Sequence, residues 1–522
     1  MTAARRWSEP WVVHEDDDLL VVAKPAGVNT HRADVHAQDG MYEWVQRQRP
    51  DGSLSILHRL DKVTSGVLVF GKTADANRAL TKQFEDRTVA KHYELLTATS
   101  GGSSTARSDE PIDGAAASTD FERVRSGKAF DRHVASPHSG RTHQVRLHAE
   151  ALGLPIAGDL DHGGREAARV FLHARSIEFD HPNGERTTFV ADVPPSFDAT
   201  AAGAVSARGP AARLLAAHEA RVALFDPNDT DAYQWVDRHH DGFPDLRIER
   251  LGRTALILDY RDGDAELPSG WVDALHETLD LDAVHHLPKP RGGGGGVARR
   301  VSGTGGPRFG VRELGVQYRI DLEASPTSSG LFLDQRETRR DLLSSDLDGK
   351  TVLNTFAHTG ALSVAAALAG AETLTLDLSK HYLDWARDNL RANDLDPEDH
   401  DFVYGDALDW MARFAKRGRT FDRVLVDPPT SSTARKGSKR WVVTKDLDQL
   451  VSLAAELCSP GGSVYVSTNS RKMTWERFVG QVERGLHSAG RIGVIEPRTL
   501  PLDHRSGPGD PPYLKGAWIR LD

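Results

Sequence analysis

Apolar and polar positions follow two different patterns along the chain. In residues 1–198, short valine and leucine runs such as 67–70 alternate with polar turns, a pattern typical of strands joined by turns. From about residue 321, strand candidates alternate with helical patterns, which predicts βαβ units and a parallel sheet with ligand sites at its carboxyl edge. The strand candidates are 352–353, 373–377, 421–427 and 463–467, and the helices are 361–369 and 381–393.

The change of pattern divides the chain into a multidomain protein of mixed α/β and α+β class. Residues 1–198 form the first predicted domain. A stretch of small residues makes 199–211 a predicted linker. Residues 212–320 carry short strands and one helix near 270–280, which indicates a small α+β domain. Residues 321–522 then form the domain with the parallel sheet.

Composition is that of a globular protein with 39% hydrophobic and 27% charged residues. No apolar run is long enough to cross a bilayer, and the first 20 residues lack a signal-peptide pattern. Cys458 is the only cysteine, which excludes a disulfide framework and a cysteine-based zinc site. We therefore expect a cytoplasmic enzyme without a bound metal.

The net charge of −10 argues against a protein that coats nucleic acid without specificity. Two local basic stretches could still hold an RNA backbone, one at 289–308 around a run of five glycines and one at 435–440. In the second stretch, Arg435, Lys439 and Arg440 are candidate RNA-binding residues. Alternatively, both stretches are solvated loops that bind no partner.

Two motifs of the first domain combine acidic and basic side chains. HRLDKVTSG at 58–66 places Asp61 next to a cation in a polar turn before a strand, and spacing alone favours a surface ion pair. GRTHQVRLH at 140–148 opens a helical pattern. Its histidines, His143 and His148, lie five positions apart without an acidic ligand at a suitable spacing, so a metal site is not expected.

Together these motifs resemble the RluA-type pseudouridine synthases, and the resemblance covers about residues 11–197. The other matching motifs are KPAG at 24–27, KHY at 91–93, GLPIAGD at 153–159 and FLHA at 171–174. The resemblance implies a mixed-sheet pseudouridine synthase fold that needs neither cofactor nor metal. It leaves rRNA and tRNA open as substrates.

The resemblance also implies a role for individual residues. Asp61 would be the essential carboxylate, which either attacks C1′ of the ribose or removes a ribose proton. Arg146 would pair with Asp61 and keep it ionised. Tyr93 would stack on the base and assist proton removal at C5, and Leu172 would pack on the base. The RNA itself would be contacted by Arg59 beside the flipped nucleotide, and by Arg141 and His143.

In the last domain, polar side chains follow four successive strand candidates. A glycine-containing turn with Asn354 and Gly360 follows the first, and Asp377, Asp406 and Asp427 follow the next three. Each of them taken alone could be a helix cap or a turn residue. Because the ends of parallel strands meet at one edge of the sheet, the four together predict a ligand site, where Asp377 would accept from ribose hydroxyls.

This domain resembles class I S-adenosylmethionine (SAM)-dependent methyltransferases with a Rossmann-like fold, and the motif GLFLDQR at 330–336 resembles a group that modifies large-subunit rRNA. DPPT at 427–430 and STNSR at 467–471 favour the guanine-N7 type within that group. The resemblance implies that SAM is the cofactor and that Asp427 acts in catalysis. The implied cofactor-binding residues are Phe332, Gln335, Arg336, Asn354, Phe356, Thr359, Gly360, Asp377, Ser379, Asp406 and Pro428.

Reaction chemistry favours the same base. Cytosine C5 becomes nucleophilic only after a thiolate adds to C6, yet Thr468 stands where C5 enzymes carry a cysteine, and Cys458 lies near the end of a predicted helix. Methylation of amines usually pairs the DPP motif with an aromatic residue, where this chain has Thr430. Guanine N7 needs only positioning against the methyl group.

Three alternatives remain at this stage. The last domain could methylate cytosine C5 or a protein side chain. The chain could also be a ribosome-assembly factor that binds RNA and has one inactive site.

Overall fold

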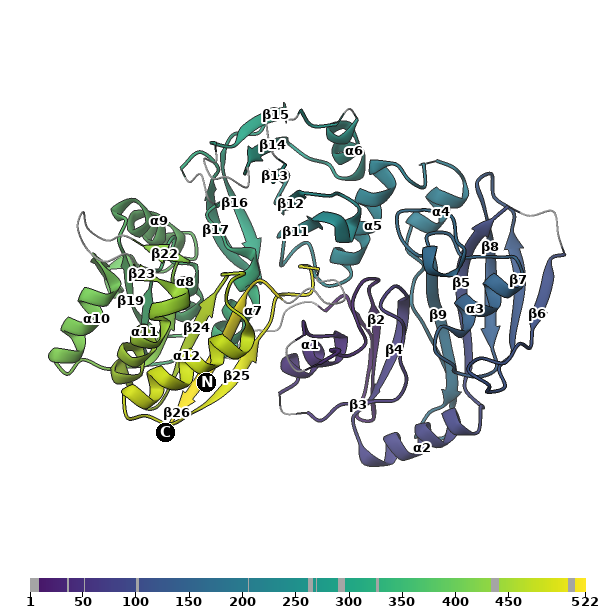
Figure 1. The fold of residues 1–522 in the computed structure, drawn as a ribbon, viewed down its shortest axis with the longest axis horizontal. Coiled ribbons are helices and arrows are strands. Elements are labelled where there is room, and N and C mark those ends of the chain that lie inside the picture. The colour runs from purple at the N-terminus through teal and green to yellow at the C-terminus, as the bar shows by residue number, and fades with distance from the viewer. Residues whose placement is uncertain are drawn as a thin grey trace.

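The computed structural model describes residues 9–34, 37–50, 52–99, 103–204, 206–261, 266–268, 270–289, 296–324, 328–432, 441–505 and 512–522. Within these ranges the chain forms a 10-stranded, a 5-stranded and a 7-stranded sheet in that order, together with two small two-stranded sheets. The 5-stranded sheet lies between the other two in space as well as in sequence (Figure 1). The expected order of a mixed-sheet, a small α+β and a Rossmann-like domain is confirmed.

The first sheet is mixed and runs in the order β1-β2-β4-β9-β5-β8-β7-β6, with β3 beside β4 and β10 beside β9. Its strands are β1 (Val12–Glu15), β2 (Leu19–Lys24), β3 (Ser55–Ile56), β4 (Ser65–Gly71), β5 (Ala90–Ala98), β6 (Thr105–Ser108), β7 (Thr119–Arg125), β8 (Phe130–Pro137), β9 (Leu172–Asp180) and β10 (Arg186–Val190). Its helices are α1 (Met41–Gln48), α2 (Ala74–Glu85), α3 (Gln144–Ala151) and α4 (Ser196–Ala201).

The centre of this sheet is a short parallel seam. Strand β4 is buried along its whole length, but it pairs with β9 only at Ser65 and Gly66. A side chain at Gly66 would come within 2.1 Å of the Ala174 carbonyl oxygen, so the close approach of the two strands requires glycine there. The loop that carries Asp61 enters the sheet at this seam.

The segment 199–211, predicted as a linker, contains regular structure at both ends. Helix α4 ends at Ala201, and helix α5 (Pro210–Val222) begins at Pro210. Thr200 and Ala201 are buried, and Glu219 of α5 accepts hydrogen bonds from the backbone and the hydroxyl of Ser196. The two domains are therefore packed together across this segment.

The middle sheet has the order β11-β12-β13-β14-β15 and two different apolar faces. Its elements are β11 (Ala232–Asp237), β12 (Leu246–Leu251), β13 (Thr254–Asp259), α6 (Trp271–Thr278), β14 (Ala283–Pro288) and β15 (Arg299–Gly303). One face packs with α5, α6 and α1 in a core that includes Trp44, Leu214 and Ile248. The other packs with the hairpin β16 (Arg308–Glu313) and β17 (Val316–Asp321) in the core that includes Leu256 and Tyr318.

The last sheet has the order β20-β19-β18-β21-β24-β26-β25, with β18 to β21 and β24 parallel and β26 antiparallel. Its strands are β18 (Thr351–Thr355), β19 (Glu372–Asp377), β20 (Asp401–Tyr404), β21 (Phe421–Val426), β24 (Cys458–Thr468), β25 (Gly493–Arg498) and β26 (Lys515–Leu521). A two-stranded pair, β22 (Ser431–Ser432) and β23 (Trp441–Val442), follows β21 in the chain.

Helices cover both faces of this sheet. Helices α7 (Arg336–Leu343), α8 (Ala361–Leu368) and α9 (Lys380–Arg391) contribute to one apolar core, and α10 (Ala407–Lys416), α11 (Val443–Leu457) and α12 (Trp475–Ser488) to the other. In the part of the chain that is described, no helix has the length and apolar character needed to cross a membrane.

A fully buried ion cluster joins the last domain to the middle one. The Arg336 guanidinium on α7 lies 3.0 Å from Glu313 of β16 and 2.6 Å from Asp503, and it donates to the carbonyl of Ala232 in β11. Arg339 binds the second oxygen of Glu313 at 2.5 Å. We call these four charged residues, Glu313, Arg336, Arg339 and Asp503, the buried ion cluster.

We predict that Arg336→Met lowers the free energy of unfolding by about 3–5 kcal/mol, because it leaves buried carboxylates without their main counter-charge. Urea unfolding followed by circular dichroism measures the change. The matched control is Arg308→Met, which removes an exposed pair with Asp321 at 2.8 Å and should cost less than about 1 kcal/mol. Equal effects of both substitutions would contradict the structural role of the cluster.

Two candidate active sites

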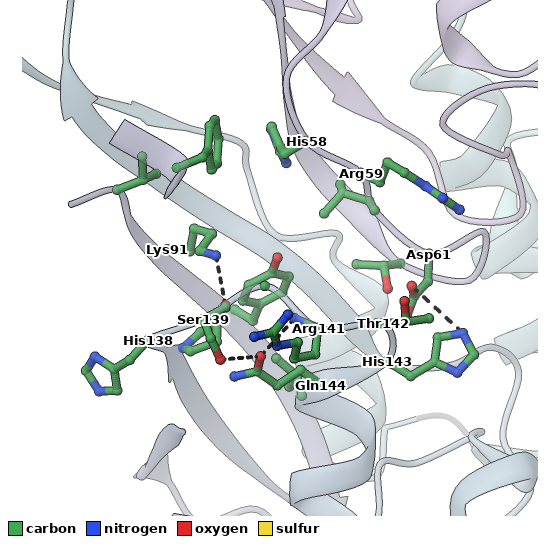
Figure 2. Close-up of a pocket in the computed structure, with 18 of the residues that line it drawn as sticks. His58, Arg59, Asp61, Lys91, His138, Ser139, Arg141, Thr142, His143 and Gln144 are labelled. Carbon is green, nitrogen blue, oxygen red and sulfur yellow. Dashed lines mark hydrogen bonds and ion pairs between the residues drawn. The ribbon is translucent and has the colours of Figure 1, made fainter. Parts of the chain in front are cut away.

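The first candidate site is a cavity of about 670 Å³ at the seam of the N-terminal sheet. The loop before β4, strand β5, the end of β8, the start of α3 and the first residue of β9 line it, and Figure 2 shows their side chains converging on it. Every residue predicted for the pseudouridine synthase site lines this cavity, namely Arg59, Asp61, Tyr93, Arg141, His143, Arg146 and Leu172.

Asp61 faces an arginine and a histidine at moderate distance. Its Oδ2 atom lies 3.7 Å from Nη1 of Arg146. Its Oδ1 atom lies 4.0 Å from Nε2 of His143, a pair that Figure 2 marks with a dashed line. The Asp61 side chain keeps 27% of its surface exposed. The carboxylate is thus oriented by positive charge while it remains accessible from the cavity.

The pairing predicted between Arg146 and Asp61 is not the main contact of Arg146. Its Nε and Nη2 atoms bind the two carboxylate oxygens of Asp159, both at 2.7 Å, and both residues are buried. Such a fork of two parallel hydrogen bonds fixes the guanidinium plane, which leaves Nη1 for Asp61. The sequence analysis missed Asp159 as a positioning residue, although it ends the motif GLPIAGD.

Tyr93 and His58 have strongly shifted pKa values. Burial raises the pKa of Tyr93, and the charge of Asp61 raises it further, so the phenol stays protonated. Burial lowers the pKa of His58 to about 3, and its ring Nε2 accepts a hydrogen bond from the backbone N–H of Val69. His58 is therefore a neutral ring with its proton on Nδ1, a lining residue to which the sequence analysis gave no role.

The N-terminus of α3 is held in an unusual conformation. His143 precedes the helix with a φ of 54°, a strained value for a residue with a side chain. The buried amide of Gln144 accepts from Ser139 and from the backbone of Arg141, and it donates to Ser118 and Thr119. These bonds stabilise the turn that presents His143 and Arg141 to the cavity.

Positive charge surrounds the mouth of the cavity in a chain with a net charge of −10. Arg59, Arg87 and Arg141 line it with exposed side chains, and Lys91 lies deeper, where it donates to the carbonyl of Ser139 at 3.0 Å. This arrangement suits an anionic polymer backbone.

The second candidate site is a cavity of about 300 Å³ at the carboxyl edge of the last sheet. Residues that follow β18, β19, β20 and β21 line it, as the parallel topology requires. The predicted site residues that it brings together are Phe332, Gln335, Phe356, Asp377, Asp406, Asp427 and Pro428. Lining residues without a predicted role include Asp334, His358, Tyr382, Asn469 and Leu514.

Asp377 ends β19 and Asp406 follows the neighbouring strand β20. The carboxylates of both can accept hydrogen bonds from a ligand. The two oxygens of Asp377 accept from the backbone N–H groups of His358 and Ser379, each at 2.8 Å, and burial raises the pKa of Asp377. Asp406 caps α10 through the backbone N–H of Asp409. Each carboxylate oxygen has further lone pairs, so these bonds orient the groups without saturating them.

Aromatic rings form one wall of this cavity. The His358 ring lies 4.8 Å from Phe332 and 4.3 Å from Tyr382, and burial lowers the pKa of His358 to about 4. Phe356 and His358 both have positive φ values, 55° and 50°, in the turn after β18. Strain of this kind in a loop that lines a cavity is typical of a functional site. The rings offer a surface on which a planar ring system can stack, and the carboxylates offer acceptors for hydroxyl groups.

Asp427 lies at the floor of the cavity and is held from two sides. Ser467 donates to its Oδ1 at 2.6 Å, and the Gln335 amide donates to its Oδ2 at 3.0 Å. Burial raises the pKa of Asp427 to about 6, and the nearby charge of Asp334 contributes to the rise. The group is therefore ionised at neutral pH in a position with little water.

Several predicted cofactor residues lie behind the cavity. Asn354 donates to Ser363, Thr359 donates to the carbonyl of Gly330, Ser379 caps α9, and Gly360 packs against Ala386 at the start of α8. The prediction for Arg336 is wrong, because its guanidinium belongs to the buried ion cluster and does not reach the cavity. Arg435, Lys439 and Arg440 lie outside the described residues.

Cys458 is remote from this site. It is the first residue of β24, directly after α11, and Thr468 ends the same strand at the cavity edge. Cys458 pairs with Phe421 and Val466 pairs with Val426, five residues further along β21, so at about 3.3 Å per residue Cys458 and Thr468 lie about 23 Å apart. Burial raises the pKa of Cys458 to about 11, so it is a thiol at neutral pH. Among the described residues, no group of three or more metal-binding side chains is arranged to hold a metal ion.

Comparisons with known families find a match in each half of the chain. The model of the RNA pseudouridylate synthase family matches residues 18–151, and the model of the S-adenosylmethionine-dependent methyltransferase family matches residues 289–496. The solved structure of SMU.776, a candidate methyltransferase with bound SAH, is similar with a TM-score of 0.55 and 25% identity over 68% of this chain and 89% of that one.

Curated relatives are similar to the second half of the chain. YwbD of Bacillus subtilis (strain 168), a candidate ribosomal RNA large subunit methyltransferase, is 33% identical over 301 residues, which cover 56% of this chain and 75% of that protein. Ribosomal RNA large subunit methyltransferase K/L of Shewanella loihica is 34% identical over 209 residues, or 40% of this chain and only 27% of the relative. The chain therefore belongs to the S-adenosylmethionine-dependent methyltransferase family and carries, ahead of its methyltransferase domain, an RNA pseudouridylate synthase domain.

Proposed function

We propose that this protein modifies RNA twice: its N-terminal site converts uridine to pseudouridine, and its C-terminal site methylates N7 of a guanine in large-subunit rRNA. The observation that carries the first assignment is Asp61, oriented by Arg146 in a cavity with a cationic mouth. The second rests on the cavity around Asp377 and Asp427 together with the distant position of Cys458. The names of the relatives support large-subunit rRNA as the substrate.

Pseudouridine formation requires that uracil leaves C1′ of its ribose, rotates and rejoins through C5. The Asp61 carboxylate can attack C1′ or remove a ribose proton, and the geometry is compatible with both routes. The Arg146 guanidinium, 3.7 Å away, orients the Asp61 carboxylate. Tyr93 supplies a protonated phenol beside the base, and Leu172 supplies an apolar surface for it.

Methylation of guanine N7 needs a positioned base and a stabilised positive charge. SAM, when bound, supplies an electrophilic methyl group. Guanine N7 is already nucleophilic and would need no prior activation, so the site would have to hold the base in line with the methyl group and stabilise the positive charge that passes to the purine as the carbon–sulfur bond breaks. Asp427 and Asp334 at the floor of the cavity would stabilise that charge. Cytosine C5 chemistry would need a thiolate at this position, and Cys458 is at the opposite end of β24.

We predict that Asp61→Asn abolishes pseudouridine formation and leaves methylation unchanged, because the amide keeps the shape of the side chain but cannot act as nucleophile or base. Tritium release from C5-labelled uridine in RNA and methyl transfer from labelled SAM can be measured on the same preparation. Asp75→Asn, an exposed position on α2, is the matched control. Residual activity within about tenfold of wild type, a barrier change of about 1.4 kcal/mol, would remove Asp61 from this role.

For the cofactor site, Asp377→Ala should weaken SAM binding by about 1.5–3 kcal/mol through loss of a charged acceptor for the ribose hydroxyls. Titration calorimetry on the full chain tests it, since the domains share a core. The control Asp384→Ala removes an exposed carboxylate on α9 and should leave the affinity unchanged. An unchanged affinity of the Asp377 variant would mean that the cofactor binds elsewhere.

A further prediction concerns the methylated base. Digestion of the modified rRNA to nucleosides and mass spectrometry should find 7-methylguanosine, and Cys458→Ser should retain methyl transfer because no covalent enzyme intermediate forms. The 7-methylguanosine signal should map to one site that is lost when the gene is deleted. Detection of 5-methylcytidine, or loss of all transfer in the serine variant, would contradict the guanine assignment.

A further inference from the structure

A third cavity, of about 180 Å³, lies between the middle sheet and the SAM cavity. A single water needs about 10–15 Å³ of such a cavity, so this one has room for a ligand considerably larger than water. Phe332, Asp334 and Asn469 line this cavity and the SAM cavity alike, so the two adjoin. The rest of its lining comes from β11, β12 and β13, and from Tyr260, Lys289, Ser328, Ser329, Leu331, Leu333, His504 and Tyr513.

Two charged side chains of β12 point into this cavity with atoms left unsatisfied. Leu246 and Ile248 face the core with α5 and α6, so Arg247 and Glu249 lie on the opposite face, toward the methyltransferase domain. In the part of the chain that is described, the buried atoms Nη2 of Arg247 and Oε2 of Glu249 have no hydrogen-bond partner. Buried polar atoms without partners are costly, so these two atoms are available to a ligand that carries complementary hydrogen-bonding groups.

The orientation of Arg247 is fixed by its surroundings. Its Nε atom donates to Asp237 at 3.2 Å, and its guanidinium lies 4.9 Å from the centre of the Tyr513 ring. The Tyr513 hydroxyl in turn donates to Asp334 at 3.1 Å. These contacts hold the arginine in place and leave Nη2 directed at the cavity. Tyr260 and Phe332 provide apolar ring surfaces in the lining, and the Phe332 ring is 41% exposed.

We propose that this cavity binds the methyl-accepting base and that Glu249 and Arg247 select guanine there. The inference rests on the proposed methylation of guanine N7. An ionised carboxylate only accepts hydrogen bonds, and guanine is the RNA base with two adjacent donors, N1–H and the N2 amine, on its Watson–Crick edge. The neighbouring O6 acceptor meets Nη2 of Arg247. The ring that carries N7 is then free to face the adjoining SAM cavity, and Phe332 and Tyr260 can stack on the base.

Glu249→Gln replaces one acceptor by a donor without changing shape. In the full chain, we expect it to lower kcat/KM for methyl transfer to rRNA on the order of 10-fold to 100-fold. SAM affinity and pseudouridine formation should be unchanged, since Glu249 lines neither of those cavities. The matched control is Glu277→Gln, an exposed position on α6 at the other face of the sheet, which should behave like wild type.

A second measurement separates recognition from support of the fold. An rRNA fragment with inosine at the methylated position lacks the N2 amine but keeps N7. Wild-type enzyme should lose about tenfold in kcat/KM on this fragment, whereas Glu249→Gln should lose little more, because the two changes remove the same contact. A structural role of Glu249 would leave the inosine penalty equal in both enzymes, and that result would overturn the proposal.

The outcomes also separate guanine selection by this cavity from the proposed methylation of guanine N7. If the wild type forms 7-methylguanosine and Glu249→Gln is fully active, the cavity does not select the base, while guanine-N7 methylation stands. If the variant loses SAM affinity to the same degree as methyl transfer, Glu249 supports the cofactor site and the proposal fails. If the wild type forms a different methylated nucleoside, guanine-N7 methylation fails first and the guanine selection fails with it.

Discussion

The buried ion cluster of Glu313, Arg336, Arg339 and Asp503 is the constraint on which the arrangement of the domains depends. Removing charges from water is costly, and the cost is offset only if every charge meets its counter-charge in good geometry. Here Glu313 comes from the β16–β17 hairpin, the two arginines come from α7, and Asp503 comes from the segment between β25 and β26. Arg336 also donates a hydrogen bond to the carbonyl of Ala232. Any displacement of one element would leave a charge uncompensated, so these elements have one relative position.

The segment around Asp503 also contacts the pseudouridine synthase domain. Arg505 donates to the carbonyl of Ala26 at 2.6 Å, and Gln38 donates to the carbonyl of Pro501 at 2.9 Å. Gly27 has a φ of 81°, which favours glycine, and the end of the Arg505 side chain fills the space that a side chain there would take. The N–H of Gly27 donates to the carbonyl of Lys62, directly after Asp61. One continuous set of contacts therefore supports both sites, although their chemistries are independent.

The two sites place their carboxylates in different surroundings, in keeping with different tasks. Asp61 lies at the cationic, accessible cavity at the seam between β4 and β9, where a polyanion can approach. Asp427 is buried under hydrogen bonds from Ser467 and Gln335, and its pKa is raised to about 6. A group that reacts with its substrate needs access, whereas a group that stabilises charge acts more strongly where water is excluded.

By itself, the sequence determined the features that depend on local order along the chain. Periodicity placed β19, β21 and β24 almost where they are found, and the residues that end parallel strands, Asp377, Asp406 and Asp427, meet at one cavity because topology requires it. Tertiary structure alone decided which charges meet. Arg146 binds Asp159 more closely than Asp61, and Arg336 binds Glu313 and Asp503, 23 and 167 positions away, instead of lining the cofactor site. No local pattern encodes such pairs, because the partners of a buried charge are selected by three-dimensional packing and desolvation rather than by spacing in the sequence.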